Sequence, residues 1–192
     1  NYRKHVHGNP LQRWLIHRFH VAALTLLGHA EINTVLDAGC GEGFVLQELL
    51  AKCPSARPVG LDASLAALEL AHQLHPHCAF VAGNLLAFPF ANGSFEAVIC
   101  TEVLEHLTDP AQGLAELRRV AGKVLLLTVP NEPLFRMSNL LRGKNVRRWG
   151  DDVGHVQHWT AKSFVEFVMA QGCKVISWRT SFPWVLVLCW RA

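Results

Sequence analysis

The sequence of 192 residues predicts an α/β protein built on a mainly parallel sheet with helices on both faces. Between residues 34 and 129, short apolar runs rich in β-branched residues alternate with amphipathic helical stretches, a pattern typical of right-handed β-α-β crossovers. Two further apolar runs at 173–178 and 184–190 are joined by a tight turn, so they pair antiparallel. Hydrophobic residues at 51% and charged residues at 17% supply a core and exclude an intrinsically disordered chain.

Composition also narrows the class of protein. No apolar run approaches the roughly 20 residues that a membrane-spanning helix needs, and the longest run contains Pro183. A net charge of +3 is too weak to indicate a nucleic-acid partner by itself. The six cysteines form no Cys-x-x-Cys pair, and several lie in apolar runs. We therefore expect free thiols and a reducing, cytoplasmic compartment.

Local signals mark the ends of the expected helices and strands. Asn9-Pro10 starts a helix that ends before Gly28, and Gly172 follows the last helix. Apolar residues at helical spacing predict helices at 10–27, 44–51, 65–74, 112–120 and 161–171, with a helical stretch near 103–107. Clusters of apolar and β-branched residues predict strands at 34–37, 58–62, 79–82, 95–100, 123–129, 173–178 and 184–190. Residues 130–157 lack periodicity and predict a loop or short helix.

The most informative motif is Asp-Ala-Gly-Cys-Gly-Glu-Gly at residues 37–43, between the first internal strand and its helix. Its three alternating glycines permit positive φ angles and a close approach of a ligand to the backbone. A dinucleotide fingerprint would need a glycine at position 44, where Phe44 stands. A phosphate-binding loop would need Lys and Ser or Thr after Gly43, and neither is present. The carboxylate of Asp37 would repel a pyrophosphate and would suit a cationic ligand.

Asp62 ends the next strand, nineteen residues after Gly43. A carboxylate at that place can accept hydrogen bonds from both hydroxyls of a ribose. The two motifs together indicate that the ligand is a nucleoside with a positively charged group and no phosphate. S-adenosylmethionine, with its ammonium and sulfonium groups, fits that description. The alternative is that the glycines only serve a tight turn and that Asp37 and Asp62 cap helices.

Five segments in order resemble the motifs of class I S-adenosylmethionine-dependent methyltransferases, including the ubiquinone-pathway O-methyltransferases. They are residues 37–43, 60–64, 83–96, 102–107 and 127–131. The resemblance implies a Rossmann-like sheet of seven strands, mostly parallel with one antiparallel strand. It also implies that S-adenosylmethionine is bound by Asp37, Gly39, Cys40, Gly41, Gly43, Asp62, Ala63, Asn84, Leu85 and Thr101. Where the family usually has Asp, this chain has Asn84, whose side-chain oxygen can still accept a hydrogen bond.

The resemblance also predicts the domain organisation. Residues 1–30 would form a helical segment that closes over the cofactor site. Residues 31–192 would form the methyltransferase domain, with 131–158 as the loop on the substrate side.

A second candidate site is a divalent metal centre. On a helix, Glu102, Glu105 and His106 would share one face at i, i+3 and i+4, and an ion such as Mg²⁺, Mn²⁺ or Zn²⁺ would relieve the repulsion between the carboxylates. His155 or His158 would complete it, with His155 favoured because Gly154 before it allows an unusual backbone approach. The pattern resembles the Glu-x-x-Glu-His motif of small-RNA 3′-terminal 2′-O-methyltransferases. In the metal-free alternative, His106, His155 or His158 is a general base.

Basic residues cluster in one part of the segment after residue 130, beside Trp149: Arg136, Arg142, Lys144, Arg147 and Arg148. They either attract an anionic substrate to the opening of the site or form a solvated surface. With a single aromatic residue among them, they are too few to favour nucleic acid. We expect methyl transfer to an oxygen of a small molecule. The alternatives are a metal-dependent RNA 2′-O-methyltransferase-like enzyme and a cofactor-binding module without catalysis.

Overall fold

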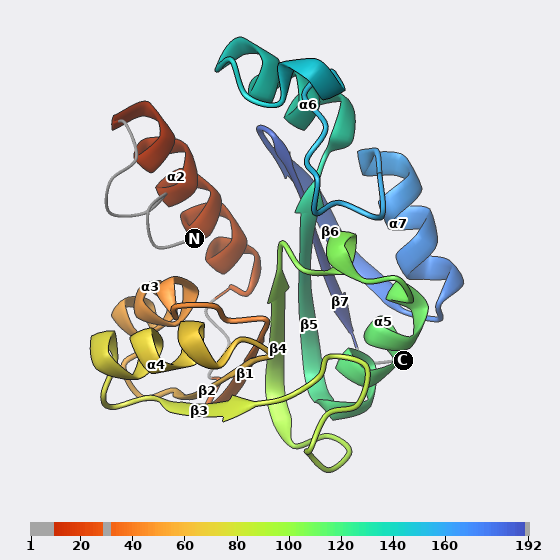
Figure 1. The fold of residues 1–192 in the computed structure, drawn as a ribbon. Coiled ribbons are helices and arrows are strands. Elements are labelled where there is room, and N and C mark those ends of the chain that lie inside the picture. Colours follow the sequence, from red (N-terminus) through yellow and green to blue (C-terminus); the bar gives the residue numbers. More distant parts are fainter. Residues whose placement is uncertain (1–9, 29–31, 191–192) are drawn as a thin grey trace.

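The computed structural model describes residues 10–28 and 32–190, which are organised around one seven-stranded sheet in the order β3-β2-β1-β4-β5-β7-β6 (Figure 1). The strands are β1 (Thr34–Ala38), β2 (Arg57–Asp62), β3 (Ala79–Ala82), β4 (Phe95–Thr101), β5 (Ala121–Pro130), β6 (Lys174–Ser181) and β7 (Trp184–Trp190). Neighbours among β1 to β5 pair parallel, whereas β7 pairs antiparallel with both β5 and β6. The predicted α/β class and the mixed seven-stranded sheet are confirmed.

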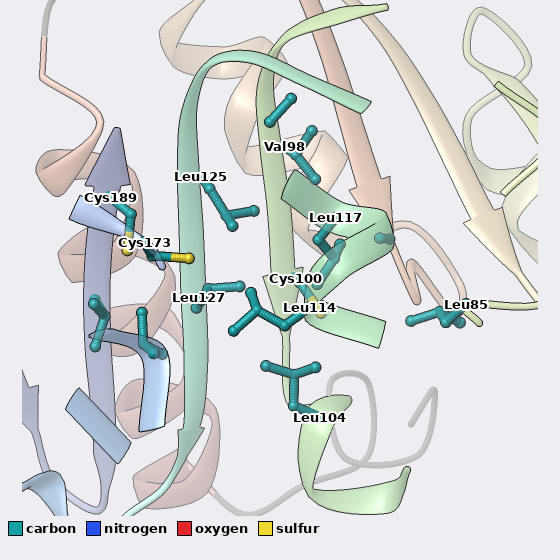
Figure 2. Packing of buried hydrophobic residues seen from close by; sticks show 14 of the residues in the cluster. Leu85, Val98, Cys100, Leu104, Leu114, Leu117, Leu125, Leu127, Cys173 and Cys189 are labelled. Carbon is teal, nitrogen blue, oxygen red and sulfur yellow. The ribbon is translucent and has the colours of Figure 1, made fainter. Parts of the chain in front are cut away.

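Helices cover both faces of this sheet, as predicted (Figure 1). They are α2 (Pro10–Leu26), α3 (Phe44–Lys52), α4 (Leu65–Leu74), α5 (Pro110–Val120), α6 (Glu132–Leu141) and α7 (Ala161–Ala170), with short 3₁₀ turns η1 (Leu104–His106) and η2 (Val146–Arg148). One buried cluster joins α2 and α3 to the sheet through Phe19, Leu46 and Ile99. The other, shown in Figure 2, joins α5 and α7 to the opposite face through residues such as Leu117 and Leu127.

The two clusters follow from the side-chain alternation of the central strands. On β4, Ala97 and Ile99 belong to the α2–α3 side, and Val98 and Cys100 to the α5–α7 side. Because both faces of a parallel sheet are covered, these strands are apolar at consecutive positions rather than at every second one. All four side chains are fully buried.

Two local predictions need correction. The segment 130–157 was expected to be a loop or short helix, but it contains the ten-residue helix α6 as well as η2. The expected helical stretch at 103–107 is a single 3₁₀ turn over Leu104–His106. The predicted boundary at residues 30 and 31 lies outside the described residues, as do residues 1–9 of the expected N-terminal segment. No helix among the described residues is long and apolar enough to cross a bilayer.

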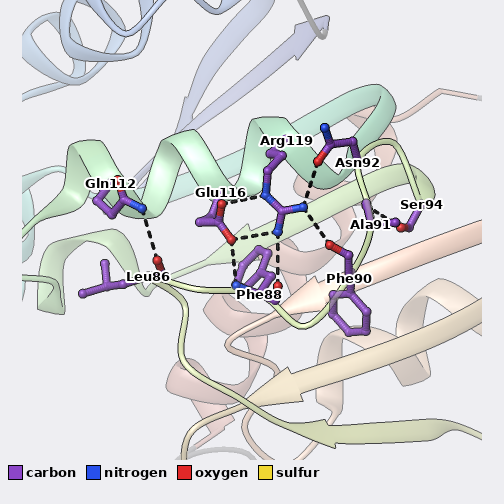
Figure 3. A network of polar contacts seen from close by, with 9 residues as sticks. All are labelled: Leu86, Phe88, Phe90, Ala91, Asn92, Ser94, Gln112, Glu116 and Arg119. Carbon is purple, nitrogen blue, oxygen red and sulfur yellow. Dashed lines mark hydrogen bonds and ion pairs between the residues drawn. The ribbon is translucent and has the colours of Figure 1, made fainter.

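A polar network on α5 holds the connection between β3 and β4 (Figure 3). The Arg119 guanidinium donates to both carboxylate oxygens of Glu116, at 2.7 and 2.8 Å. It also donates to the backbone oxygens of Phe88 and Phe90 and to the side chain of Asn92. Glu116 in turn accepts from the Phe88 N–H at 2.7 Å. One fixed fork of donors therefore anchors the segment that follows Asn84.

Arg119→Lys should lower the free energy of unfolding by about 1–2 kcal/mol, because an ammonium cannot bind Glu116 in two places and hold two carbonyls as well. Urea unfolding followed by circular dichroism measures this loss. Lys162→Gln is the control, since it breaks an exposed ion pair with Glu166 at 3.7 Å and should cost less than about 0.5 kcal/mol. Equal losses for the two variants would contradict a stabilising role for the network.

Candidate functional site

The turn between β1 and α3 has the strand–turn–helix form that the glycine motif predicts. Gly39 and Gly43 both have φ angles of 82°. A Cβ at Gly39 would overlap the side chain of Val103, and one at Gly43 would lie 2.7 Å from the ring of His75. The backbone N–H groups of Gly39 and Cys40 donate to the Leu61 oxygen at 2.7 and 3.0 Å. The turn is therefore fixed against β2 in a shape that only glycine permits at these two positions.

Asp62 joins the turn to the start of α4. Its two carboxylate oxygens accept from the N–H groups of Gly41 and Ser64, each at 2.8 Å. The N-cap of α4 is Ser64, whose hydroxyl accepts from Ala67 at 3.3 Å. Asp62 therefore fixes two backbone segments at the edge of the sheet instead of acting as the N-cap.

The remaining expected cofactor residues lie on neighbouring segments. Ala63 is exposed after β2, Leu85 is buried beyond β3, and Thr101 ends β4. Asn84 is exposed, and its side-chain oxygen accepts from the Leu86 N–H at 2.9 Å.

Asp37 is fully buried beneath the glycine turn. Neither of its carboxylate oxygens has a hydrogen-bond partner among the described residues. Desolvation, assisted by the charge of Asp62, raises the pKa of Asp37 from 3.8 to about 7. The charge of this residue is thus set by pH near neutrality.

A cavity of about 280 Å³ lies above the turn. Its lining comes from α2, the turn and the start of α3, the segment after β4, α6, the loop at 152–155 and the turn at 183–184. Of the expected cofactor residues, Gly39, Cys40 and Thr101 line it, whereas Asp37, Asp62 and Asn84 do not. Helix α2 supplies one wall, with Phe19 packed against the Trp184 ring at a centroid distance of 4.6 Å.

Three of the predicted metal ligands meet in this cavity. Glu105, His106 and His155 each offer a ligand atom within 4.8 Å of the others. His106 Nδ1 lies 2.7 Å from the Gly154 oxygen, and His155 Nδ1 lies 2.7 Å from Glu132 Oε1. A carbonyl oxygen only accepts, so His106 Nδ1 carries the proton and leaves its Nε2 lone pair for a ligand. Outer hydrogen bonds of this kind are typical of histidines that bind metal ions.

Glu105 is 1% exposed, and both its carboxylate oxygens lack a hydrogen-bond partner among the residues described. Burial first, and then the charge of Glu102, raise the pKa of Glu105 well above its ordinary value, with smaller effects from Glu132 and Asp152. Its backbone oxygen accepts from the N–H groups of residues 156 and 157 at 2.8 and 3.0 Å. These bonds bring the loop that carries His155 onto η1.

Glu102 corrects the predicted helical face. Its φ angle is +59°, so it precedes η1 in a left-handed conformation and does not continue a helix with Glu105 and His106. Its carboxylate still lines the cavity and accepts from Trp184 Nε1 at 2.7 Å. Glu102, Glu105 and His106 therefore lie together because they follow the end of β4, and not because they share one face of a helix.

His158 does not line the cavity, and its Nε2 lies 2.8 Å from Asp151 Oδ1. Desolvation opposes a charge on His155, but the hydrogen bond and charge of Glu132 outweigh it and raise the pKa of His155. Glu132 was absent from the predicted site, although it is buried and follows β5 directly. Its position just beyond a strand end was the signal that could have identified it.

Comparisons with known proteins agree with this geometry. Residues 35–123 match the model of a family described as a methyltransferase domain. A probable S-adenosylmethionine-dependent methyltransferase of Mycolicibacterium smegmatis is 37% identical over 103 residues, which cover 53% of this chain and 39% of that protein. A ubiquinone biosynthesis O-methyltransferase of Pseudomonas paraeruginosa is 34% identical over 134 residues, covering 65% and 53%. The chain thus spans about half the length of these curated relatives or less.

The fold is shared with solved structures. A putative methyltransferase of Bacillus halodurans superposes with a TM-score of 0.72 at 16% identity, covering 90% of this chain and 98% of the other.

Asp37→Asn should stabilise the protein increasingly as pH rises. Below the unfolded-state pKa of 3.8, both states hold the proton, so burial of the neutral acid carries no electrostatic penalty. As pH rises to about 7, the unfolded state ionises more readily than the folded state, and stability is lost. The penalty that asparagine removes reaches roughly 4 kcal/mol at most.

Urea unfolding at about pH 5 and about pH 8 measures this effect, and the gain should be about 2 kcal/mol larger at the higher pH. Asp109→Asn, an exposed aspartate at the N-cap of α5, is the control because asparagine also caps a helix. A gain that does not depend on pH would show that Asp37 is not a destabilised carboxyl group.

Proposed function

We propose that this chain is a class I S-adenosylmethionine-dependent methyltransferase, as the match of residues 35–123 to a methyltransferase-domain family and the similarity to curated methyltransferases support, and that it transfers the methyl group of S-adenosylmethionine to an oxygen of a small molecule. The observation that carries this proposal is the glycine turn, tied by Asp62, at the floor of a cavity that also holds Glu105, His106 and His155. A binding turn and a set of proton-accepting groups thus lie side by side.

The residues around the turn fit S-adenosylmethionine. Gly39 lines the cavity, and its backbone packs so closely against the Val103 side chain that no side chain would fit there. Asp62 uses one lone pair of each oxygen for Gly41 and Ser64, and the remaining lone pairs can accept from the ribose hydroxyls. Asn84 and Leu85 would contact the adenine, and Cys40 and Thr101 the methionine part. Helix α2, within the predicted 1–30 segment, would close the site from above.

Methyl transfer is an in-line displacement at the sulfonium carbon, so alignment of the acceptor oxygen supplies much of the rate enhancement. A hydroxyl acceptor must also lose its proton. The Nε2 atoms of His106 and His155 are suited to accept it, since the Nδ1 atoms of both rings are already engaged. Glu132 orients His155, and Gly154 orients His106. His158 pairs with Asp151 outside the cavity, so we give it no part in the reaction.

Glu105, His106 and His155 also suit a divalent ion. Two imidazoles and a buried carboxylate are ligands that Zn²⁺ and Mn²⁺ accept, and the unpartnered oxygens of Glu105 favour a nearby positive charge. When bound, such an ion would lower the pKa of an acceptor hydroxyl. Glu102, which lines the same cavity, would contribute negative charge next to it.

Two other functions are considered, an enzyme that methylates RNA and a protein that binds the cofactor without catalysis. An RNA acceptor is favoured by the exposed basic residues Arg147 and Arg148 beside the exposed Trp149, and RNA binding would weaken steeply with added salt. A cofactor-binding module would bind S-adenosylmethionine without turnover. Release of S-adenosylhomocysteine with a panel of phenols, and titration with single-stranded RNA at low salt, separate these from the leading proposal. The cytoplasmic location remains a prediction from the cysteine pattern.

Asp62→Asn should weaken S-adenosylmethionine binding by roughly tenfold to a hundredfold, because the amide loses one of the two acceptors offered to the ribose. Isothermal titration calorimetry measures the change. Glu69→Gln, on the exposed side of α4, is the matched control and should bind like the parent. No binding by the parent protein would refute the cofactor assignment.

Metal binding should require the three clustered side chains. Equilibrium dialysis with Zn²⁺ or Mn²⁺ should give one bound ion per chain, and Glu105→Gln or His106→Ala should lower the affinity at least about tenfold. Glu69→Gln again serves as the control. If the parent binds no ion and keeps its turnover in excess chelator, Glu105, His106 and His155 act as acid–base groups only.

A further inference from the structure

Helix α6 brings two of the basic residues to the cavity. Arg142 and Lys144 follow its C-terminal end and line the cavity, as do Ser138 and Asn139 on the helix itself. The other three basic residues of the segment, Arg136, Arg147 and Arg148, are not part of the lining. The broad basic cluster seen in the sequence therefore contains a smaller pair with a specific location.

One buried residue, Asn139, holds the Arg142 side chain and the Lys144 backbone. Asn139 is 3% exposed, and its side-chain oxygen accepts from Arg142 Nη2 at 2.7 Å while its nitrogen donates to the Gly150 oxygen at 2.8 Å. The Asn139 backbone oxygen accepts from the N–H of Lys144 at 2.8 Å, and Arg142 Nε donates to the Ser138 oxygen at 3.0 Å. The guanidinium is thus oriented before any ligand arrives, and its other N–H groups remain for a ligand.

Neither cation has a carboxylate partner within the described part of the chain. The ion pairs there involve other basic residues, for example Arg148 with Asp151 at 3.5 Å. Partial desolvation lowers the pKa of Arg142, and no carboxylate offsets it. The C-terminal end of α6 favours a positive charge at this place.

Carboxylates gather around the two histidines of the cavity. Glu102, Glu105 and Asp152 lie there, and Glu42 is a fourth carboxylate of the lining. Phe135 on α6 packs against His155 with ring centroids 5.2 Å apart. Arg142 comes seven residues later, about 10 Å further along the helix at 1.5 Å per residue. That span suits an aromatic ring with a short acidic side chain.

We propose that Arg142 and Lys144, oriented by Asn139, form an anion subsite that binds a carboxylate or phosphate of the methyl acceptor and directs its hydroxyl toward His106 and His155. The subsite rests on the proposed function and gives it a substrate class, that of small hydroxylated acids. The carboxylates around His106 and His155 disfavour an anion at that place.

Caffeate and its methyl ester are the matched probes, because they share the catechol ring and differ at the far end, where the ester has a methyl group in place of the negative charge. Calorimetric titration of the parent protein in the presence of S-adenosylhomocysteine should show about tenfold tighter binding of caffeate. In Arg142→Gln and in Lys144→Gln the preference should fall to about threefold or less. Arg147→Gln, an exposed residue outside the lining, should keep it.

Competition of acetate and of inorganic phosphate with caffeate shows which anion the subsite prefers. Stronger competition by acetate indicates a carboxylate, and stronger competition by phosphate indicates a phosphate group. Equal binding of caffeate and its ester to the parent, or binding of neither, overturns the subsite. So does an Arg142→Gln variant that loses affinity for S-adenosylmethionine instead of caffeate, because the pair would then hold the methionine carboxylate. Titration of the parent with S-adenosylmethionine tests the proposed function separately, and the caffeate comparison without cofactor still reports the subsite if that titration fails.

Discussion

Burial of the Glu105 carboxyl group is the constraint on which the rest of the cavity depends. Transfer of an ionised carboxylate from water into a site without hydrogen-bond donors is strongly unfavourable, and this side chain has none among the residues that the structure describes. The backbone of the same residue binds the loop at 156–157, so the group cannot turn toward solvent without disturbing that loop. The surrounding side chains must supply protons or positive charge, and His106 and His155 are the groups placed to do so.

The sheet explains why residues so distant in sequence meet there. In parallel strands connected by right-handed crossovers, the carboxyl ends lie at one edge, and the segments that follow them form the site. The glycine turn follows β1, Asp62 ends β2, Glu102 and Glu105 follow β4, and Glu132 follows β5. The antiparallel β7 then brings Trp184 to the same edge, where it binds Glu102. The glycine turn and these four carboxylates thus owe their places to strand ends, whereas α6 and the loop at 152–155 supply further polar groups of the cavity.

That dependence on strand ends also explains which features the sequence could predict. The glycine turn and Asp62 are local signals, since a turn that excludes a Cβ and a carboxylate at a strand end are both visible in the residue order. The succession of strands and helices along the chain followed from alternation, and the antiparallel pair followed from a short turn. Glu102 was grouped with Glu105 by helical spacing, which fails because the Glu102 N–H bonds to Thr128 on β5 and its backbone turns left-handed. Helix α6 is amphipathic, but its buried side carries polar residues such as Ser138 and Asn139 where apolar ones are expected.

Those buried polar residues of α6 give the helix a second role beyond packing. An apolar side chain cannot replace Asn139 in its two side-chain contacts, since its amide binds Gly150 and Arg142. An apolar residue there would pack but would leave the Gly150 oxygen and the guanidinium without partners. Glu132 at the other end of the helix is likewise committed to His155. One helix thus orients His155 at its first turn and Arg142 just past its last. In the proposed site, the length of α6 would set the distance between the two ends of the acceptor and so determine which hydroxyl reaches the methyl donor.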